Sequence, residues 1–242
     1  MSTVLSETAE QLRDAIKAEA HWHVVIHPTS FKPDRIPTLK DAWKSMEECS
    51  VHLRADYPQV DRENRGQGSD WISSWCDFAG EREYWKLFQS GQFAQVFALN
   101  ENSWPKALEY ALEKARILAP GTRASGVVDV VELLHTTTEI FEFSSRLAQR
   151  TALDSSMSVK IGMMGIGGRL LTKRGAPFWS GAYFASQPYL EYSREIPVDE
   201  LVGNSAELAL DYALWFYERF GWLDAPIAKL KNDQHNLLTR TF

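Results

Sequence analysis

Strands in this sequence follow one another in runs, and that order limits the possible folds more than any other feature. Residues 71–78, 83–89 and 92–99 are each predicted as strands, with Ser90-Gly91 as a two-residue hairpin connection between the last two. Strict alternation of strands with helices would indicate a doubly wound parallel sheet, whereas consecutive strands indicate segregated helices and strands. We therefore predict an α+β fold with mainly antiparallel sheets.

The chain of 242 residues is long for one domain and short for two. We predict two strand-rich halves, residues 1–120 and 121–242, each closed by a helix and packed closely as one unit. The helix expected over 204–220 is apolar around most of its circumference, which predicts that it is the most buried helix and packs across the second sheet, that of residues 121–242. The other helices are expected over residues 5–19, 38–49, 103–118 and 126–150, and the other strands over 22–27, 51–54, 157–164, 169–172, 179–184 and 189–195.

The balance of charge restricts the expected partners. The chain has 26 Lys and Arg against 32 Asp and Glu, a formal net charge of −6. Non-specific nucleic-acid binding depends on basic side chains that neutralise phosphates, so nucleic acid is not the expected partner. A basic stripe over Lys160, Arg169, Lys173 and Arg174 leaves a nucleic-acid-binding hairpin as an alternative, and a solvated strand face is the simpler interpretation.

The sequence also predicts a compartment. Residues 1–20 are polar and helix-like, without the apolar stretch of a signal peptide, and no run approaches the ~18 apolar residues of a membrane span. Cys49 and Cys76 lack the spacing of a disulfide framework or a zinc knuckle. We therefore expect a cytoplasmic, reduced protein without membrane contact.

Three histidines lie close together in the first thirty residues. On an extended strand, His21 and His23 share one face two residues apart, and His27 follows them. A metal site needs a third and usually a fourth ligand with supporting hydrogen bonds, and nearby residues do not supply them unambiguously. We interpret these histidines as a half-exposed strand face and predict no metal.

The helix expected over 126–150 carries a second suggestive cluster. Glu132, His135 and Glu139 contain the Glu-x-x-His half-motif of di-iron bundles, which needs a second copy on another helix and further glutamates. His135 with Glu139, and Glu142 with Arg146, form i,i+4 pairs of small energy. We interpret this cluster as a solvated, salt-bridged helix face.

Neither the glycines nor the cysteines form a catalytic motif. The glycines at 162, 165, 167 and 168 precede a predicted strand, whereas a dinucleotide-binding loop precedes a helix, so they predict a turn. The loop over 65–69 lacks the Gly-Lys-Ser/Thr ending of a P-loop. Cys76 is best interpreted as a small packed residue. We predict no catalytic residue and no cofactor.

Aromatic residues are numerous, with nine Trp and twelve Phe. Such rings fill cores, and they also anchor protein interfaces. Phe143 interrupts the charged face of the helix over 126–150, and we assign it, together with Trp85 and Trp179, to a partner-binding surface. The predicted partner is another protein or a second copy of this chain.

Four segments, 34–39, 84–93, 138–143 and 214–222, carry a resemblance when taken together: Asp-Arg-Ile-Pro-Thr-Leu, Tyr-Trp-Lys-Leu-Phe-Gln-Ser-Gly-Gln-Phe, Thr-Glu-Ile-Phe-Glu-Phe and Leu-Trp-Phe-Tyr-Glu-Arg-Phe-Gly-Trp. Their order resembles the region that follows the DNA-binding module in bacterial proteins of the AlbA-2, or Schlafen-like, type, over roughly residues 22–222. In such proteins the DNA- or ATP-associated chemistry belongs to the preceding module. The resemblance therefore implies a sensory or partner-binding part, and no site residue is carried over from it.

Two functions are consistent with these observations. The first is a non-catalytic accessory or sensor protein of bacteria, regulatory or defence-associated, that binds a partner protein or a small ligand through an aromatic-lined surface. The alternative is a hydrolase or nucleotide-processing enzyme. That alternative requires His21, His23 or His135 to converge in a pocket with carboxylates of perturbed pKa.

Overall fold

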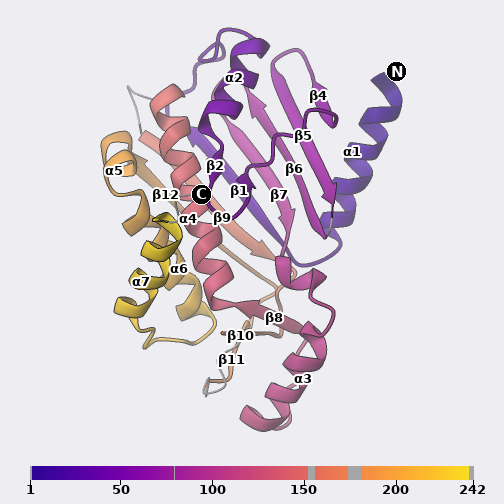
Figure 1. The fold of residues 1–242 in the computed structure, drawn as a ribbon, viewed down its shortest axis with the longest axis vertical. Helices are drawn as coiled ribbons and strands as arrows, with labels where there is room; N and C mark the ends of the chain where they lie inside the picture. Colours follow the sequence, from indigo (N-terminus) through magenta and orange to yellow (C-terminus); the bar gives the residue numbers. More distant parts are fainter. Residues whose placement is uncertain (1, 79, 152–155, 174–180, 240–242) are drawn as a thin grey trace.

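The computed structural model describes residues 2–78, 80–151, 156–173 and 181–239. Its centre is a seven-stranded sheet in which every neighbouring pair of strands is antiparallel (Figure 1). The α+β class and the mainly antiparallel arrangement are thus confirmed. The strands lie in the order β12 (Tyr189–Pro197), β9 (Ser156–Met164), β1 (His21–Pro28), β7 (Phe93–Ala98), β6 (Glu81–Phe88), β5 (Trp71–Phe78) and β4 (Arg65–Gln67).

Both sequence halves contribute strands to this sheet. Strands β9 and β12, from beyond residue 121, join it through β1, which pairs with β9 on one side and with β7 on the other. A three-stranded sheet consists of β8 (Gly126–Asp129), β10 (Arg169–Thr172) and β11 (Tyr183–Phe184), and a two-stranded hairpin consists of β2 (Val51–His52) and β3 (Asp56–Tyr57).

The helices pack on both faces of the central sheet. Helices α4 and α6 lie across one face with α7 packed against them (Figure 1). Helix α1 packs against β6 and β7 on the other face, where Leu12 and Ile16 meet Trp75 and Val96. The helices are α1 (Ser2–Lys17), α2 (Leu39–Cys49), α3 (Ala107–Leu118), α4 (Val130–Thr151), α5 (Val198–Gly203), α6 (Ser205–Arg219) and α7 (Ile227–Leu238), with a 3-10 turn η1 (Asn100–Ser103).

The core follows from strand alternation. In β1, Trp22, Val24 and Ile26 point toward α4 and α6 and are buried, whereas His23 and Val25 lie partly exposed on the other face. The same face of this sheet receives the apolar side of α6, which was expected on a second sheet and lies instead on the one sheet that both halves share. The burial of these side chains from both sequence halves forms one continuous apolar cluster.

Two expected helix starts can be compared with the structure. Thr38, the first residue of the helix expected over 38–49, is the N-cap of α2, because its hydroxyl accepts a hydrogen bond from the backbone N–H of Asp41 at 3.1 Å. The long helix was expected from residue 126 but begins at Val130, since Gly126–Asp129 pairs with β10 as a parallel strand. Asp129 then accepts hydrogen bonds from the N–H groups of Val131 and Glu132, which ends the strand and starts the helix.

No helix in the described part of the chain combines the length and the apolar character needed to cross a membrane.

Candidate ligand pocket

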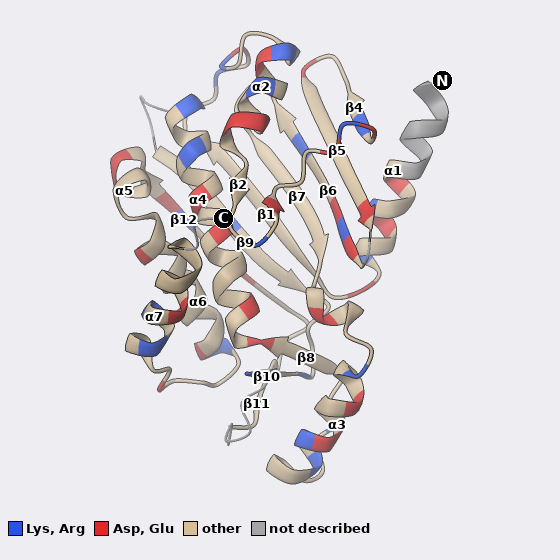
Figure 2. Ribbon diagram, viewed as in Figure 1, with Lys and Arg blue, Asp and Glu red and all other residues tan. Residues whose placement is uncertain are grey.

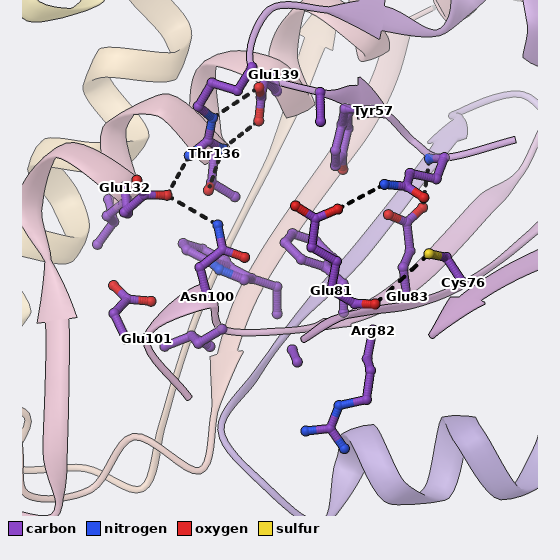
Figure 3. A pocket seen from close by; sticks show the side chains of 18 of the residues that line it. Tyr57, Cys76, Glu81, Arg82, Glu83, Asn100, Glu101, Glu132, Thr136 and Glu139 are labelled. Atoms are coloured by element: carbon purple, nitrogen blue, oxygen red, sulfur yellow. Dashed lines mark hydrogen bonds and ion pairs between the residues drawn. The ribbon is translucent and has the colours of Figure 1, made fainter. Parts of the chain in front are cut away.

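A pocket of about 240 Å³ lies where β5, β6 and β7 face the first half of α4 and the β2–β3 hairpin (Figure 3). Its lining is unusually acidic, with six carboxylates against two arginines, Arg54 and Arg82. Figure 2 shows the corresponding acidic segments on β6 and α4. The six acidic residues come from four separate segments of the chain: Asp56, Glu81, Glu83, Glu101, Glu132 and Glu139.

Arg54, between β2 and β3, holds one wall of the pocket. Its Nε and Nη2 donate to the two carboxylate oxygens of Glu139 at 3.0 and 2.5 Å, and its Nη1 donates to Glu132 at 2.5 Å. Nη2 also donates to the Thr136 hydroxyl at 3.2 Å, and Asn100 donates to Glu132 at 3.1 Å. Burial alone would lower the pKa of Arg54, but the charges and hydrogen bonds of the two glutamates outweigh it and raise that pKa.

Glu81 and Glu83, on β6, form the opposite wall. The backbone N–H of Gln59 donates to Glu83 at 3.0 Å, and the Gln59 side-chain amide donates to Glu81 at 2.9 Å. Within the described ranges, neither carboxylate forms an ion pair with Lys, Arg or His. Burial, with smaller contributions from the charges of Glu81 and Glu139, raises the pKa of Glu83 to about 8, against the opposing hydrogen bond from the Gln59 backbone.

Glu101, in η1, is a third carboxylate without an ion-pair partner among the described residues. Its side chain is buried, and Oε1 accepts a hydrogen bond from the backbone N–H of Asp129 at 2.6 Å. Burial raises the pKa of Glu101 to about 7. A proton is therefore available on both Glu83 and Glu101 close to neutral pH.

Aromatic rings form the apolar part of the lining. Trp22 of β1 and Phe97 of β7 stack with centroids 6.0 Å apart, and Tyr57 meets Phe97 edge to face at the same separation. The Tyr57 hydroxyl donates to Gln95 Oε1 at 2.5 Å, which fixes the ring beside the pocket. Register explains this wall, because Trp22 lies directly opposite Phe97 in the β1–β7 pair.

The second arginine does not neutralise the unpaired wall. Arg82 points away from the neighbouring Glu81 and Glu83 side chains (Figure 3), as expected for successive residues on one strand. Its guanidinium forms an ion pair with Glu19, beyond the end of α1. Of the two cations in the lining, only Arg54 therefore pairs with pocket carboxylates.

The histidines do not converge in the pocket, which the alternative of a hydrolase with His and carboxylate residues required. None of His21, His23 and His135 is among the residues that line the pocket. His21 and His23 lie on the face of β1 opposite to Trp22, and burial lowers the pKa of His23. No group of three or more His, Cys, Asp or Glu side chains in the described part of the chain is placed to hold a metal ion.

The interpretation of Glu132, His135 and Glu139 as a solvated helix face is wrong for Glu139. That residue is only 4% exposed, because Arg54 from the β2–β3 hairpin covers it. Its partner is 85 positions away in the sequence, so local i,i+4 spacing carries no signal of it. Sequence reasoning likewise missed Glu83, whose place in the pocket depends on strand pairing.

The assignment of aromatic rings to a partner surface needs correction. Phe143 and Trp85 are both 0% exposed. The ring centroids of Phe143 and Phe93 lie 4.7 Å apart, and the Trp85 ring packs against Trp43 and Phe93. A ring without exposed surface cannot contact a partner. Trp179 lies outside the described residues, and its role stays a prediction.

The other motifs are structural. Gly165 and Gly168 have φ of +70° and +75° in the connection between β9 and β10, so this segment is the predicted turn. Burial raises the pKa of the Cys76 thiol to about 11, which keeps it protonated and poorly nucleophilic.

The basic stripe does not form a continuous surface among the described residues. Lys160 pairs with Glu191 at 3.4 Å, and Lys173 pairs with Asp233 at 2.9 Å. Arg169 donates to the Val127 carbonyl and to Asn102, while Arg174 lies outside the described residues.

No protein-family model, curated protein sequence or solved structure matches this chain. The resemblance to the AlbA-2, or Schlafen-like, proteins therefore stays a prediction.

Proposed function

We propose that this protein is a non-catalytic binding protein that takes a small polar ligand into the acidic pocket. One observation supports this above all: the pocket joins three aromatic rings to carboxylates that have no ion-pair partner among the described residues. A concave site with an apolar wall, a few convergent polar groups and perturbed pKa values is typical of ligand sites. Leaving carboxyl groups buried without a cation costs folding free energy, which a ligand could recover.

The ligand is favoured over the alternative partner, another protein. The described rings assigned to a protein interface are buried, whereas the pocket remains open to a small molecule. Its volume of about 240 Å³ lies below the roughly 300–1,000 Å³ of pockets for drug-sized ligands. A protein partner, a second copy of this chain, and a regulatory or defence-associated role in bacteria stay predictions.

A thermal-shift panel of small amines, amino acids, sugars and carboxylic acids tests this proposal. A ligand at about 100 times its Kd stabilises a protein by about 2.7 kcal/mol, which shifts Tm by several degrees. Asn100 is exposed at the pocket and can be replaced by Trp to block it, while Gln92→Trp, on an exposed turn, is the matched control.

At least one compound should raise Tm of the wild type and of Gln92→Trp but not of Asn100→Trp. If no compound does so, or if the shift survives in Asn100→Trp, the proposal is wrong.

The second candidate is a hydrolase that uses carboxylates alone. Its support is that Glu83 retains a proton near neutral pH while Glu132 is ion-paired with Arg54 in the same pocket. Two carboxyl groups in contrasting environments are the usual arrangement for acid–base catalysis. Glu83 would give its proton to the leaving oxygen, and Glu132 would accept a proton from the attacking water as the new bond to carbon forms.

A panel of p-nitrophenyl glycosides and esters tests this candidate. Hydrolysis should fall above about pH 8 as Glu83 loses its proton, and Glu83→Gln should lower the rate by about 100-fold or more. Equal rates for the wild type and Glu83→Gln would remove the candidate.

A further inference from the structure

We infer that the pocket selects a small organic cation, an ammonium or guanidinium compound, which would bind between the Glu81–Glu83 wall and the aromatic wall. This inference rests on the proposed function, because it names the chemical class of the ligand for the same site.

The charge of the lining favours a cation. Arg54 forms ion pairs with Glu132 and Glu139, and the Asp56 carboxylate lies 2.6 Å from Nδ1 of His52. Glu81, Glu83 and Glu101 remain, and none of them has an ion pair among the residues that the structure describes. An anionic ligand would add a like charge beside these groups, whereas a cation would form charge-assisted hydrogen bonds with them.

The aromatic wall favours an organic cation over a metal ion. Trp22, Tyr57 and Phe97 line the pocket beside the carboxylates, and the faces of such rings attract ammonium and guanidinium groups. A metal ion would instead require converging ligands, and the described side chains contain no group of three or more His, Cys, Asp or Glu placed to hold one. The small volume of the pocket excludes a long polyamine as a fully enclosed ligand.

Binding should be coupled to protons. In the free protein, Glu83 and Glu101 carry protons over part of the neutral range because burial disfavours their charged forms. A bound cation stabilises the charged form, so the carboxyl group releases its proton to the solvent. The affinity for a cation should therefore rise as pH increases from about 6 to about 8.5.

Isothermal titration calorimetry with three four-carbon probes tests the inference at constant ionic strength. The probes are 1,4-diaminobutane as dication, 1,4-butanediol as neutral molecule and succinate as dianion. At pH 8.5, diaminobutane should bind at least about ten-fold more tightly than either of the other two. The affinity for diaminobutane should be lower at pH 6. At pH 7, binding should release protons, which is measured by comparing the heat of binding in buffers of different ionisation enthalpy.

Three variants locate the binding. Glu83→Gln and the more exposed Glu81→Gln should each weaken diaminobutane binding by about ten-fold. Glu195→Gln removes the same charge from an exposed position of β12 and should change the affinity by less than about two-fold. Equal losses in all three variants would indicate diffuse attraction to an acidic surface and would overturn the inference.

The two proposals can fail separately. If succinate or butanediol binds as tightly as diaminobutane, the pocket is a ligand site but not a cation site. The same holds if the only compounds whose stabilising effect is lost in Asn100→Trp are neutral or anionic. If no compound depends on Asn100, both proposals are wrong.

Discussion

The two carboxylate walls of the pocket are chemically alike and differ in their partners. On α4, Glu139 is almost fully buried and receives a bidentate guanidinium from Arg54. On β6, Glu83 receives a backbone N–H from Gln59, and the surroundings raise its pKa to about 8. A buried carboxylate that is paired with a cationic side chain of the same chain helps to hold the fold together. A carboxylate without such a partner can bind a cationic ligand.

The largest expected effect concerns the paired wall. Arg54→Met leaves Glu139 buried without its cation, and breaking a buried pair from one side costs about 3–5 kcal/mol. We expect a loss of about 3 kcal/mol in the free energy of unfolding at pH 8, measured by urea denaturation. The double variant Arg54→Met/Glu139→Gln should recover part of that loss.

Arg150→Met is the control, because its pair with Glu48 is about 40% exposed on both sides and should contribute less than about 1 kcal/mol. If Arg54→Met is no more costly than Arg150→Met, Arg54 does not hold the wall.

In the unpaired wall, by contrast, removing the charge with Glu83→Gln should raise the free energy of unfolding at high pH. Since the pKa of Glu83 is about 8 in the folded protein and about 4.5 in the unfolded chain, the folded state binds more protons between these pH values. The free energy of unfolding contributed by Glu83 therefore falls as pH rises from about 4.5 to 8. One pKa unit corresponds to about 1.4 kcal/mol, and the partial exposure of Glu83 weakens the effect.

We expect Glu83→Gln to match the wild type at pH 5 and to exceed it by about 1–2 kcal/mol at pH 9, from thermal and urea unfolding. A variant less stable than the wild type at pH 9 would show that the ionised carboxylate stabilises the fold.

The smallest expected effect concerns the neutral hydrogen bond beside the two walls. Tyr57→Phe removes the hydroxyl that donates to Gln95 and leaves the Gln95 oxygen without this donor in a buried position. The expected loss is about 1 kcal/mol in the free energy of unfolding, independent of pH between 5 and 9. A pH-dependent loss would indicate that Tyr57 acts mainly through Glu83.

The sequence predicted the elements better than the pocket. The strand expected over 22–27 and the apolar helix expected over 204–220 depend on local composition and periodicity, and they correspond to β1 and α6. The strand Gly126–Asp129 was missed because it runs directly into α4 and is recognised only by its pairing with β10.

The candidate site was missed for a related reason. Glu139 looked like an i,i+4 partner of His135, and its actual contact with Arg54 depends on where the β2–β3 hairpin meets α4. Glu83 shares one face of β6 with the buried Trp85, while Tyr84 lies on the other face, so neither face is clearly polar and the place of Glu83 in the pocket could not be derived before the strand neighbours were known.

Carbon-13 NMR of glutamate side chains, with Glu83→Gln for assignment, tests the central claim most directly. The Glu83 carboxyl should titrate at about pH 8 in the free protein, and 1,4-diaminobutane should lower that pKa. A Glu83 pKa near the ordinary value of about 4.3 in the free protein, or one that the diamine leaves unchanged, would contradict the account.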